Sequence, residues 1–308
     1  MKMLVIGAGV IGSVYAARLT AAGHDVSLLV RGSRAAELER DGLHLWVGDD
    51  PMHAQPHIVT AERPGSPADL IIVAAQLTQL DGALELLDTQ DSAAVAFLQH
   101  LGPNVERVRS RVGAERTVLA FPGIGGFRRP NGSIEYLEIG AQPTTIDATA
   151  PRADVLNQAI RSTGMRTALE PDMPAWFATH SVFIACLGAG ILARGGNPTQ
   201  LAADRVLMRR VVQAIQEGFG ALNVAGIKVT PTALRVLFLQ MPRWFASLYW
   251  RRALRGPIGT VALAPHTRAS RDGEFRVLCT TVLNEVATPA TTPTLAELLA
   301  PWAQVPAE

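Results

Sequence analysis

Three glycines near the start of the chain have the spacing of a loop that binds a dinucleotide. The stretch VIGAGVIG contains Gly7, Gly9 and Gly12 as G-x-G-x-x-G, after an apolar run and before a segment with helical spacing. In such a loop the first glycine permits a tight turn, the second lets backbone amides approach a pyrophosphate, and the third lets the helix pack closely. Val10 and Ile11 would present their amides at the positive end of that helix. The pattern predicts dinucleotide binding; the alternative is a glycine turn in a protein that binds no nucleotide.

The end of the second predicted strand indicates which dinucleotide is bound. An acidic residue at this place binds the ribose 2′-hydroxyl of NAD, but the stretch LLVRGSR has Arg31 there, with Arg34 close behind. A guanidinium group suits the 2′-phosphate of NADP. The alternative is a pair of solvated surface arginines. We expect NADP(H) as the cofactor.

Two histidines are candidates for proton transfer, because imidazole changes its charge near neutral pH. His100 follows Gln99 just past a predicted strand, where open α/β sheets bind their ligands. Its alternative is a loop histidine that packs against Gln99 or a helix end. His180, followed by Ser181, lies in the apolar stretch PAWFATHSVFIACLGAGILAR. Its alternative is a buried histidine bonded to a backbone carbonyl.

Arg268, in the stretch LAPHTRASRDGEF, is a candidate for binding a substrate carboxylate. A guanidinium group can hold a carboxylate with two parallel hydrogen bonds. The alternative is a solvated turn before a helix that starts near Asp272.

The elements that must position these residues fall into two groups. Residues 1–170 alternate between buried strand-like runs and helical patterns, which predicts a parallel, doubly wound Rossmann-like sheet. In residues 171–308 helical patterns dominate, so we expect an all-α second domain. The predicted class is α/β, with the cofactor domain first and a helical substrate and dimerisation domain second.

Composition excludes several classes of protein. The chain has 308 residues and a formal net charge of +1, so bulk charge does not favour nucleic acid or an anionic membrane as a partner. Its two cysteines suit reduced thiols better than a disulfide framework. The uninterrupted apolar run from Val182 to Ala193 is about 12 residues, short of the roughly 20 that span a bilayer. We expect a buried core helix there, no signal peptide and a cytoplasmic location.

The amino-terminal stretch MKMLVIGAGVIGSVYAARLTAAGHDVSLLVR, followed by AAELERDGLHL, resembles the ketopantoate reductase family. LMRRVVQAIQEGFGALNVAGI and TPTLAELL resemble later helices of that family. The resemblance implies a Rossmann domain and an all-α domain like those of 6-phosphogluconate dehydrogenase, an active site between them, NADPH as reductant and a homodimer. It also implies cofactor contacts from Gln76 and Gln99, which follow the fourth and fifth strands.

The family's acid and substrate-binding residues are replaced in this chain. The resemblance places a catalytic lysine at Ala178 and an asparagine at Val182, and a glutamate nearest to Gly259. Ser247 matches the family's serine. At about 100° per residue, His180 lies about 160° around the helix from Ala178, so it does not simply take the place of the lysine.

These features predict an NADPH-dependent oxidoreductase that reduces a ketone or imine, is similar to ketopantoate reductase, and acts poorly on ketopantoate. The expected proton donor is His180, with His100 second, and the expected substrate contacts are Ser181, Ser247 and Arg268. We expect a small-molecule substrate and no metal. The alternative is a non-redox NADP-binding protein, either a sensor or a cyclase-type enzyme, because the lysine and the glutamate are missing.

Overall fold

The computed structural model describes residues 1–61, 67–87, 93–288 and 290–303. The chain forms two compact units, Met1–Met173 and Pro174–Glu308. The sequence pattern changes from alternating strands and helices to helices close to this division, at 170/171.

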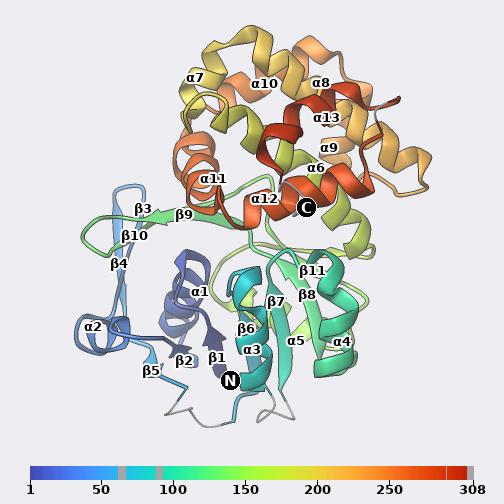
Figure 1. Ribbon diagram of the computed structural model, residues 1–308. Helices are drawn as coiled ribbons and strands as arrows, with labels where there is room; N and C mark the ends of the chain where they lie inside the picture. Colours follow the sequence, from blue (N-terminus) through green and yellow to red (C-terminus); the bar gives the residue numbers. More distant parts are fainter. Residues whose placement is uncertain (62–66, 88–92, 289, 304–308) are drawn as a thin grey trace, which may run out of the picture. The chain divides into compact units, whose positions relative to one another are not determined.

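An eight-stranded sheet forms the centre of the first unit in the described part of the chain, in the order β12-β11-β8-β7-β6-β1-β2-β5 (Figure 1). Its strands are β1 (Lys2–Ile6), β2 (Asp25–Leu29), β5 (His57–Val59), β6 (Leu70–Val73), β7 (Ala94–Leu98), β8 (Thr117–Phe121), β11 (Thr144–Asp147) and β12 (Thr167–Glu170). Neighbouring strands are parallel except for β11 and β8. β6 and β7 are buried along their whole length, as continuous apolar runs in a parallel sheet require.

The register of the sheet aligns the carboxyl ends of its central strands. Ile6 pairs with Leu29 on one side and with Val73 on the other, and Val73 pairs with Phe97. The segments that follow β1, β2, β6 and β7 therefore leave the same edge of the sheet. The strand order reverses between β1 and β6, and ligands of open α/β sheets bind at such a point.

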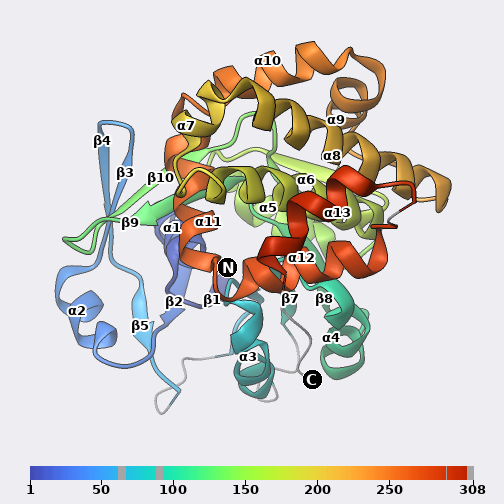
Figure 2. The ribbon, with the colours of Figure 1, turned by 45° about the horizontal axis from the view of Figure 1, so that its top comes forward.

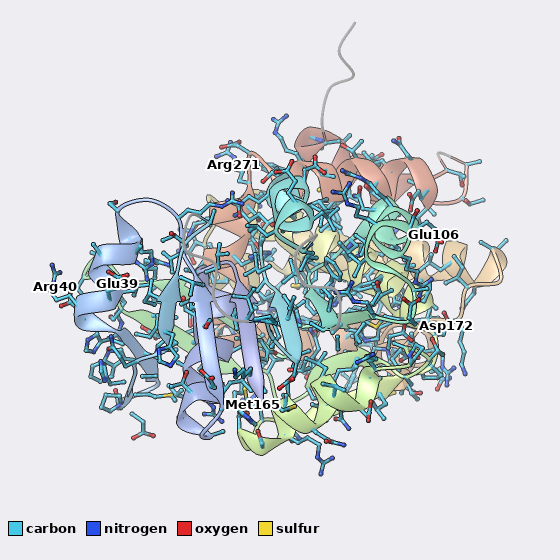
Figure 3. All side chains as sticks on the ribbon, turned by 90° about the horizontal axis from the view of Figure 1, so that it is seen from below. Glu39, Arg40, Glu106, Met165, Asp172 and Arg271 are labelled. Carbon is cyan, nitrogen blue, oxygen red and sulfur yellow. The ribbon has the colours of Figure 1, made fainter. Side chains whose placement is uncertain are left out.

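Five α-helices cover this sheet in the described part of the first unit: α1 (Val10–Ala21), α2 (Arg34–Asp41), α3 (Leu80–Leu87), α4 (Val105–Val112) and α5 (Ala153–Ser162). Short 3₁₀ turns, η1 (Leu77–Gln79) and η2 (Gly102–Asn104), precede α3 and α4. Right-handed crossovers that run in opposite directions from the centre place α1 and α3 on opposite faces. α4 is amphipathic: Val108 and Val112 are buried, whereas Glu106 points outward (Figure 3).

A second, four-stranded sheet has the order β4-β3-β10-β9 among the described residues. It comprises β3 (Leu43–Val47), β4 (Asp50–Ala54), β9 (Ile124–Arg128) and β10 (Ile134–Glu138). β9 and β10 form an antiparallel pair, and β9 contacts α1. This small sheet therefore reaches the helix that follows the glycine-rich loop.

The second unit is helical in its described residues (Figure 2). Its helices are α6 (Met173–Leu192), α7 (Pro198–Ala203), α8 (Arg205–Val224), α9 (Thr232–Arg235), α10 (Arg243–Ala253), α11 (Ala264–Ser270), α12 (Glu274–Glu285) and α13 (Pro293–Leu299), with the 3₁₀ turn η5 (Ala300–Trp302). Two π-helical segments, η3 (Val236–Gln240) and η4 (Ile258–Leu263), come before and after α10. α8 packs against both α10 and α13.

The prediction that α6 is a buried core helix is correct, but the argument from a short apolar run is wrong. This helix has 20 residues with a mean hydropathy of 1.6, so within the described chain it is long and apolar enough to cross a membrane. Of its 18-residue apolar window 89% is buried inside the protein, and many of its apolar side chains belong to the hydrophobic core of the second unit. Burial, and not shortness, is therefore the property that makes α6 a core helix.

Candidate functional site

The loop between β1 and α1 contains glycines for two different reasons. Gly7 has φ +109°, and a Cβ on it would lie 2.8 Å from the carbonyl oxygen of Ala74. A Cβ on Gly12 would overlap the carbonyl oxygen of Gly7. At Gly9 φ is −72°, and no described atom lies within 4 Å of a Cβ. The fold therefore requires glycine at 7 and 12, whereas the open space at Gly9 is what close approach of a pyrophosphate requires.

The amino terminus of α1 carries an uncompensated partial positive charge. Gly9 is the N-cap, and within the described chain no side chain caps the helix and no acidic residue lies in its first turn. Val10 and Ile11 are half-buried at this end. Because the first N–H groups of a helix have no intrahelical partner, this terminus suits a phosphate group. The residues present thus fit a dinucleotide.

Arg31 and Arg34 follow the end of β2 but point in different directions. Arg31 is exposed, and its Nη2 lies 2.9 Å from where a Cβ on Gly82 of α3 would be. Arg34 is half-buried, and its Nη1 lies 3.6 Å from Oε1 of Glu37. Its buried Nε has no hydrogen-bond partner among the described residues, and burial lowers the pKa of this guanidinium group. Arg34 is therefore a cation with unused donor capacity.

Arg128, at the end of β9, is a residue that the sequence analysis does not identify. Its Nη2 donates a hydrogen bond of 2.8 Å to the carbonyl oxygen of Ala8, inside the glycine-rich loop. The contact joins residues 120 positions apart and comes from the second sheet, so no local motif reveals it. The paired arginines in the stretch GGFRRPNG are the one local signal.

Gln76, Gln99 and His100 follow β6 and β7 at the same sheet edge as the glycine-rich loop. Gln76 is exposed, and its carbonyl oxygen accepts a hydrogen bond from the amide of Gln79. Gln99 is 9% exposed, and neither its Nε2 nor its Oε1 has a partner in the described residues. His100 is half-buried. A buried amide without partners is costly, so the Gln99 side chain is suited to bind a ligand.

His180 belongs to a row of aromatic rings in the second unit. Its side chain is buried, and its ring stacks on Trp176 with 4.7 Å between centroids and 12° between planes. The ring centroid of Phe183 lies 6.3 Å from that of His180 and 5.0 Å from that of Trp250 on α10. The described residues contain no cluster of three or more His, Cys, Asp or Glu side chains that could hold a metal ion. The surroundings of His180 are thus those of an apolar, aromatic surface.

Ser247 lies three positions before Trp250, on the same side of α10. Both side chains are buried, and neither the Ser247 hydroxyl nor the Trp250 indole Nε1 has a hydrogen-bond partner in the described residues. Ser181, beside His180 on α6, is also buried. These two donors, next to aromatic rings, could each donate a hydrogen bond to a polar atom of a bound molecule.

The positions at which the resemblance implies lysine, asparagine and glutamate have different surroundings in this structure. Val182 is fully buried, and a Cβ on Gly218 of α8 would lie 2.5 Å from its Cγ1. Ala178 packs partly buried against the same core. A Cβ on Gly259, in the π-helical η4, would overlap the carbonyl oxygen of Leu254. A glutamate at 259 is therefore incompatible with this backbone.

Arg268 is held away from His180. A solvated turn is one of the two expectations for this position, but Arg268 lies in α11. Its Nη1 donates to the carbonyl oxygen of Gly196, 3.0 Å away, and its aliphatic stem packs on that glycine. Gly196 lies beyond the carboxyl end of α6 at Leu192, which is about 18 Å along the helix from His180 at 1.5 Å per residue. The structure does not bring Arg268 and His180 together.

Comparison with known proteins identifies relatives of the first unit. The family model described as Ketopantoate reductase PanE/ApbA matches residues 3–150. An "Uncharacterized oxidoreductase YkpB" of Bacillus subtilis (strain 168) is 34% identical over 101 residues, which cover 32% of this chain and 33% of that protein. A 2-dehydropantoate 2-reductase of Aquifex aeolicus (strain VF5) is 24% identical over 226 residues, or 70% of this chain and 71% of that protein.

Solved structures share the fold over nearly the whole chain. A 2-dehydropantoate 2-reductase from Geobacter metallireducens GS-15 has a TM-score of 0.77 at 18% identity, and the match covers 98% of this chain and 99% of that chain. D-mandelate dehydrogenase, in its ternary structure with NADH and anilino(oxo)acetate, has a TM-score of 0.72 at 16% identity and covers 98% of both chains. Residues 3–150 therefore resemble the ketopantoate reductase family, and the chain shares the fold of these solved structures.

Proposed function

We propose that this protein is an NADPH-dependent reductase of a ketone or imine whose substituents are bulkier and more apolar than those of ketopantoate. The open space at Gly9, in front of the uncapped amino terminus of α1, supports the cofactor more strongly than any other observation. Gly9, Val10 and Ile11 would hold the pyrophosphate through backbone amides. Gln99, with its unpaired buried amide, would contact the nicotinamide carboxamide.

Arg31 supports the choice of NADPH over NADH. It follows β2 at the place where an acidic residue would hydrogen-bond the ribose 2′-hydroxyl of NAD. Gly82 on α3 leaves room for its guanidinium group. A planar cation of this kind binds a phosphate through two hydrogen bonds.

The proposed chemistry needs a proton donor as well as a hydride. The cofactor, when bound, supplies the hydride to the substrate carbon, and the electron pair of the C=O or C=N bond moves to the heteroatom. His180 gives that heteroatom a proton from its imidazole ring, and the Ser247 hydroxyl donates a hydrogen bond to the substrate. His100 is the second candidate for the acid. Arg268 is left out because its bond to Gly196 holds it beyond the carboxyl end of α6, away from His180.

The substrate preference follows from the surroundings of His180. Trp176, Phe183 and Trp250 provide aromatic surface, and Ala178 and Val182 provide no charge or amide group where the family has lysine and asparagine. An apolar or aromatic substituent is stabilised by such a surface.

Steady-state NADPH oxidation tests this proposal on a panel of 2-oxo acids, aryl ketones and cyclic imines. We expect turnover to be fastest with aryl or bulky alkyl substituents. The His180→Ala variant should lose about 100- to 10,000-fold in kcat, as removal of a general acid does. It should keep its NADPH affinity, and the fall of kcat with rising pH should disappear.

His57→Ala is the matched control, because His57 is exposed on β5 and pairs with Asp25. Wild-type turnover in both His180→Ala and His100→Ala would overturn the assignment of the acid. Tight NADPH binding without oxidation on any member of the panel would overturn the reductase itself and favour a non-redox NADP-binding protein.

A further inference from the structure

Beyond Arg31 and Arg34, the structure brings a third arginine to the loop expected to bind the cofactor. Arg128 comes from β9 in the second sheet, and its Nη2 donates to the carbonyl oxygen of Ala8, between Gly7 and Gly9. In a loop of this type the residues next to the first glycine lie close to the adenosine ribose, because the pyrophosphate sits on the following helix terminus. Arg128 is therefore anchored beside the place that the adenosine ribose of a bound dinucleotide would take, which is the part that differs between NAD and NADP.

The turn that follows Arg128 approaches α2, so Arg128 and Arg34 bring positive charge to the same region. A Cβ on Gly132 would lie 3.1 Å from Oε1 of Glu37, and that oxygen lies 3.6 Å from Nη1 of Arg34. Both arginine side chains are half-buried, and burial, followed by the positive charge of Arg34, lowers the pKa of Arg128. Glu37 is the carboxylate that acts on both arginines. Two partly desolvated guanidinium groups beside a single carboxylate keep a net positive charge, which favours binding of an anion with more than one negative charge.

Both cations retain donors for such an anion. A guanidinium group has five N–H donors, and the bond to Ala8 uses one Nη2 donor of Arg128. The buried Nε of Arg34 has no partner within the described residues. Arg34 also lines a cavity of about 350 Å³ beside α2, so this half-buried side chain is open to solvent.

We propose that Arg128 is a specificity-determining residue, which joins Arg34 in binding the adenosine 2′-phosphate and so makes the protein discriminate NADPH from NADH. This inference rests on the proposed function, since it concerns the cofactor of the same reductase. The bond to Ala8 fixes the guanidinium group in place, and the remaining donors face the phosphate. A free 2′-phosphorylated adenosine fragment should bind through the same residues.

The neighbouring Arg129 is a matched control for Arg128. Its Nε and Nη2 donate to Oε2 of Glu135, 3.1 and 3.0 Å away, and its guanidinium group lies 5.1 Å from the Trp46 ring. Arg40 on α2 is a second control, because it points outward and pairs with Asp41 (Figure 3). These arginines carry the same charge but are bound elsewhere.

The experiment measures dissociation constants for NADPH, NADH and 2′,5′-ADP by fluorescence titration on the full chain. Arg128→Ala and Arg34→Ala should each raise the dissociation constants for NADPH and 2′,5′-ADP about 10- to 100-fold, as loss of a charged hydrogen bond does. NADH affinity should change less than about threefold. Arg128→Lys should recover only part of the loss, because an ammonium group lacks the planar fork. Arg129→Ala and Arg40→Ala should match the wild type.

Several outcomes would overturn the inference. Equal losses for NADPH and NADH in Arg128→Ala would show that the residue only shapes the loop. Preference for NADPH in the wild type with no loss in Arg128→Ala would overturn the role of Arg128 and leave the proposed function standing. Preference of the wild type for NADH would overturn both. Should Arg128→Ala fail to fold, Arg128→Lys and the weakening of 2′,5′-ADP binding by Arg34→Ala decide the question.

Discussion

The glycine-rich edge of the first unit and the aromatic row of the second unit differ in how their polar groups are supplied. At the glycine-rich edge the backbone provides the binding surface: an uncapped helix terminus and an open space at Gly9. Along the aromatic row only side chains could provide such a surface, and the lysine, asparagine and glutamate that the resemblance implies are replaced at Ala178, Val182 and Gly259. A backbone surface is fixed by the fold, whereas a side-chain surface changes with single substitutions. The first region lies in the part of the chain that matches the family model, and the second region is where the chain departs from the pattern of that family.

The largest effect should come from glycines that look equivalent in the motif. Gly12→Ala should lower the free energy of unfolding by more than about 3 kcal/mol, because its Cβ would overlap the Gly7 carbonyl oxygen. Gly9→Ala should change stability by less than about 1 kcal/mol but weaken NADPH about 100-fold or more, because its methyl group enters the open space. Thermal denaturation and NADPH titration separate the two effects. Equal destabilisation by both substitutions would contradict the claim that the fold requires Gly12 whereas the ligand requires Gly9.

An intermediate effect is expected from two buried serines of the second unit. Ser247 has an unpaired hydroxyl, whereas the Ser270 hydroxyl donates to the carbonyl oxygen of His266 at 2.8 Å. Ser247→Ala should raise KM for the substrate about 5- to 10-fold and leave stability unchanged. Ser270→Ala should do the reverse, with KM unchanged and a loss of about 1 kcal/mol in the free energy of unfolding. The same response from both serines in either measurement would remove Ser247 from the substrate site.

The smallest effect concerns the thiols of the helical core. Burial raises the pKa of Cys279 to about 12 and that of Cys186 well above its usual value. In the unfolded chain these thiols ionise near their ordinary pKa, so they contribute stability below about pH 8.5 that is lost as the pH rises toward 12. At pH 8 a disulfide reagent should label neither cysteine in the folded protein and both after denaturation. Rapid labelling of the folded protein would show that this core opens readily.

Much of the first unit is predictable from local patterns. The glycine motif, the apolar strands and the parallel register need only short stretches of sequence, and the positions of Gly7, Gln99 and His100 at one sheet edge follow from them. The stretch GSIEYLEIGAQPTTIDA, residues 132–148, is harder. Its pattern predicts one strand-turn-strand extension, but β10 pairs in the small sheet and β11 in the large one. Strand partners distant in sequence decide such cases.

The aromatic row and the third arginine are not predictable in the same way. Trp176 and His180 lie four residues apart on one helix, so their stacking fits helical spacing. The approach of Trp250 to Phe183 depends on how α10 packs, and the bond of Arg128 to Ala8 joins two sheets. Arg268 is the opposite case. Its residue type suits a substrate carboxylate, but tertiary packing bonds its guanidinium group to the carbonyl oxygen of Gly196.

The burial of α6 also has a consequence for synthesis of the chain. The ring of Phe275 on α12 packs directly on Gly188 of α6, where no larger side chain would fit. At about 5 to 20 residues per second, roughly 5 to 20 seconds pass between translation of these two residues. During that interval the face of α6 around Gly188 lacks the cover that Phe275 supplies. The nascent protein thus exposes, for some seconds, an apolar surface that the finished protein buries.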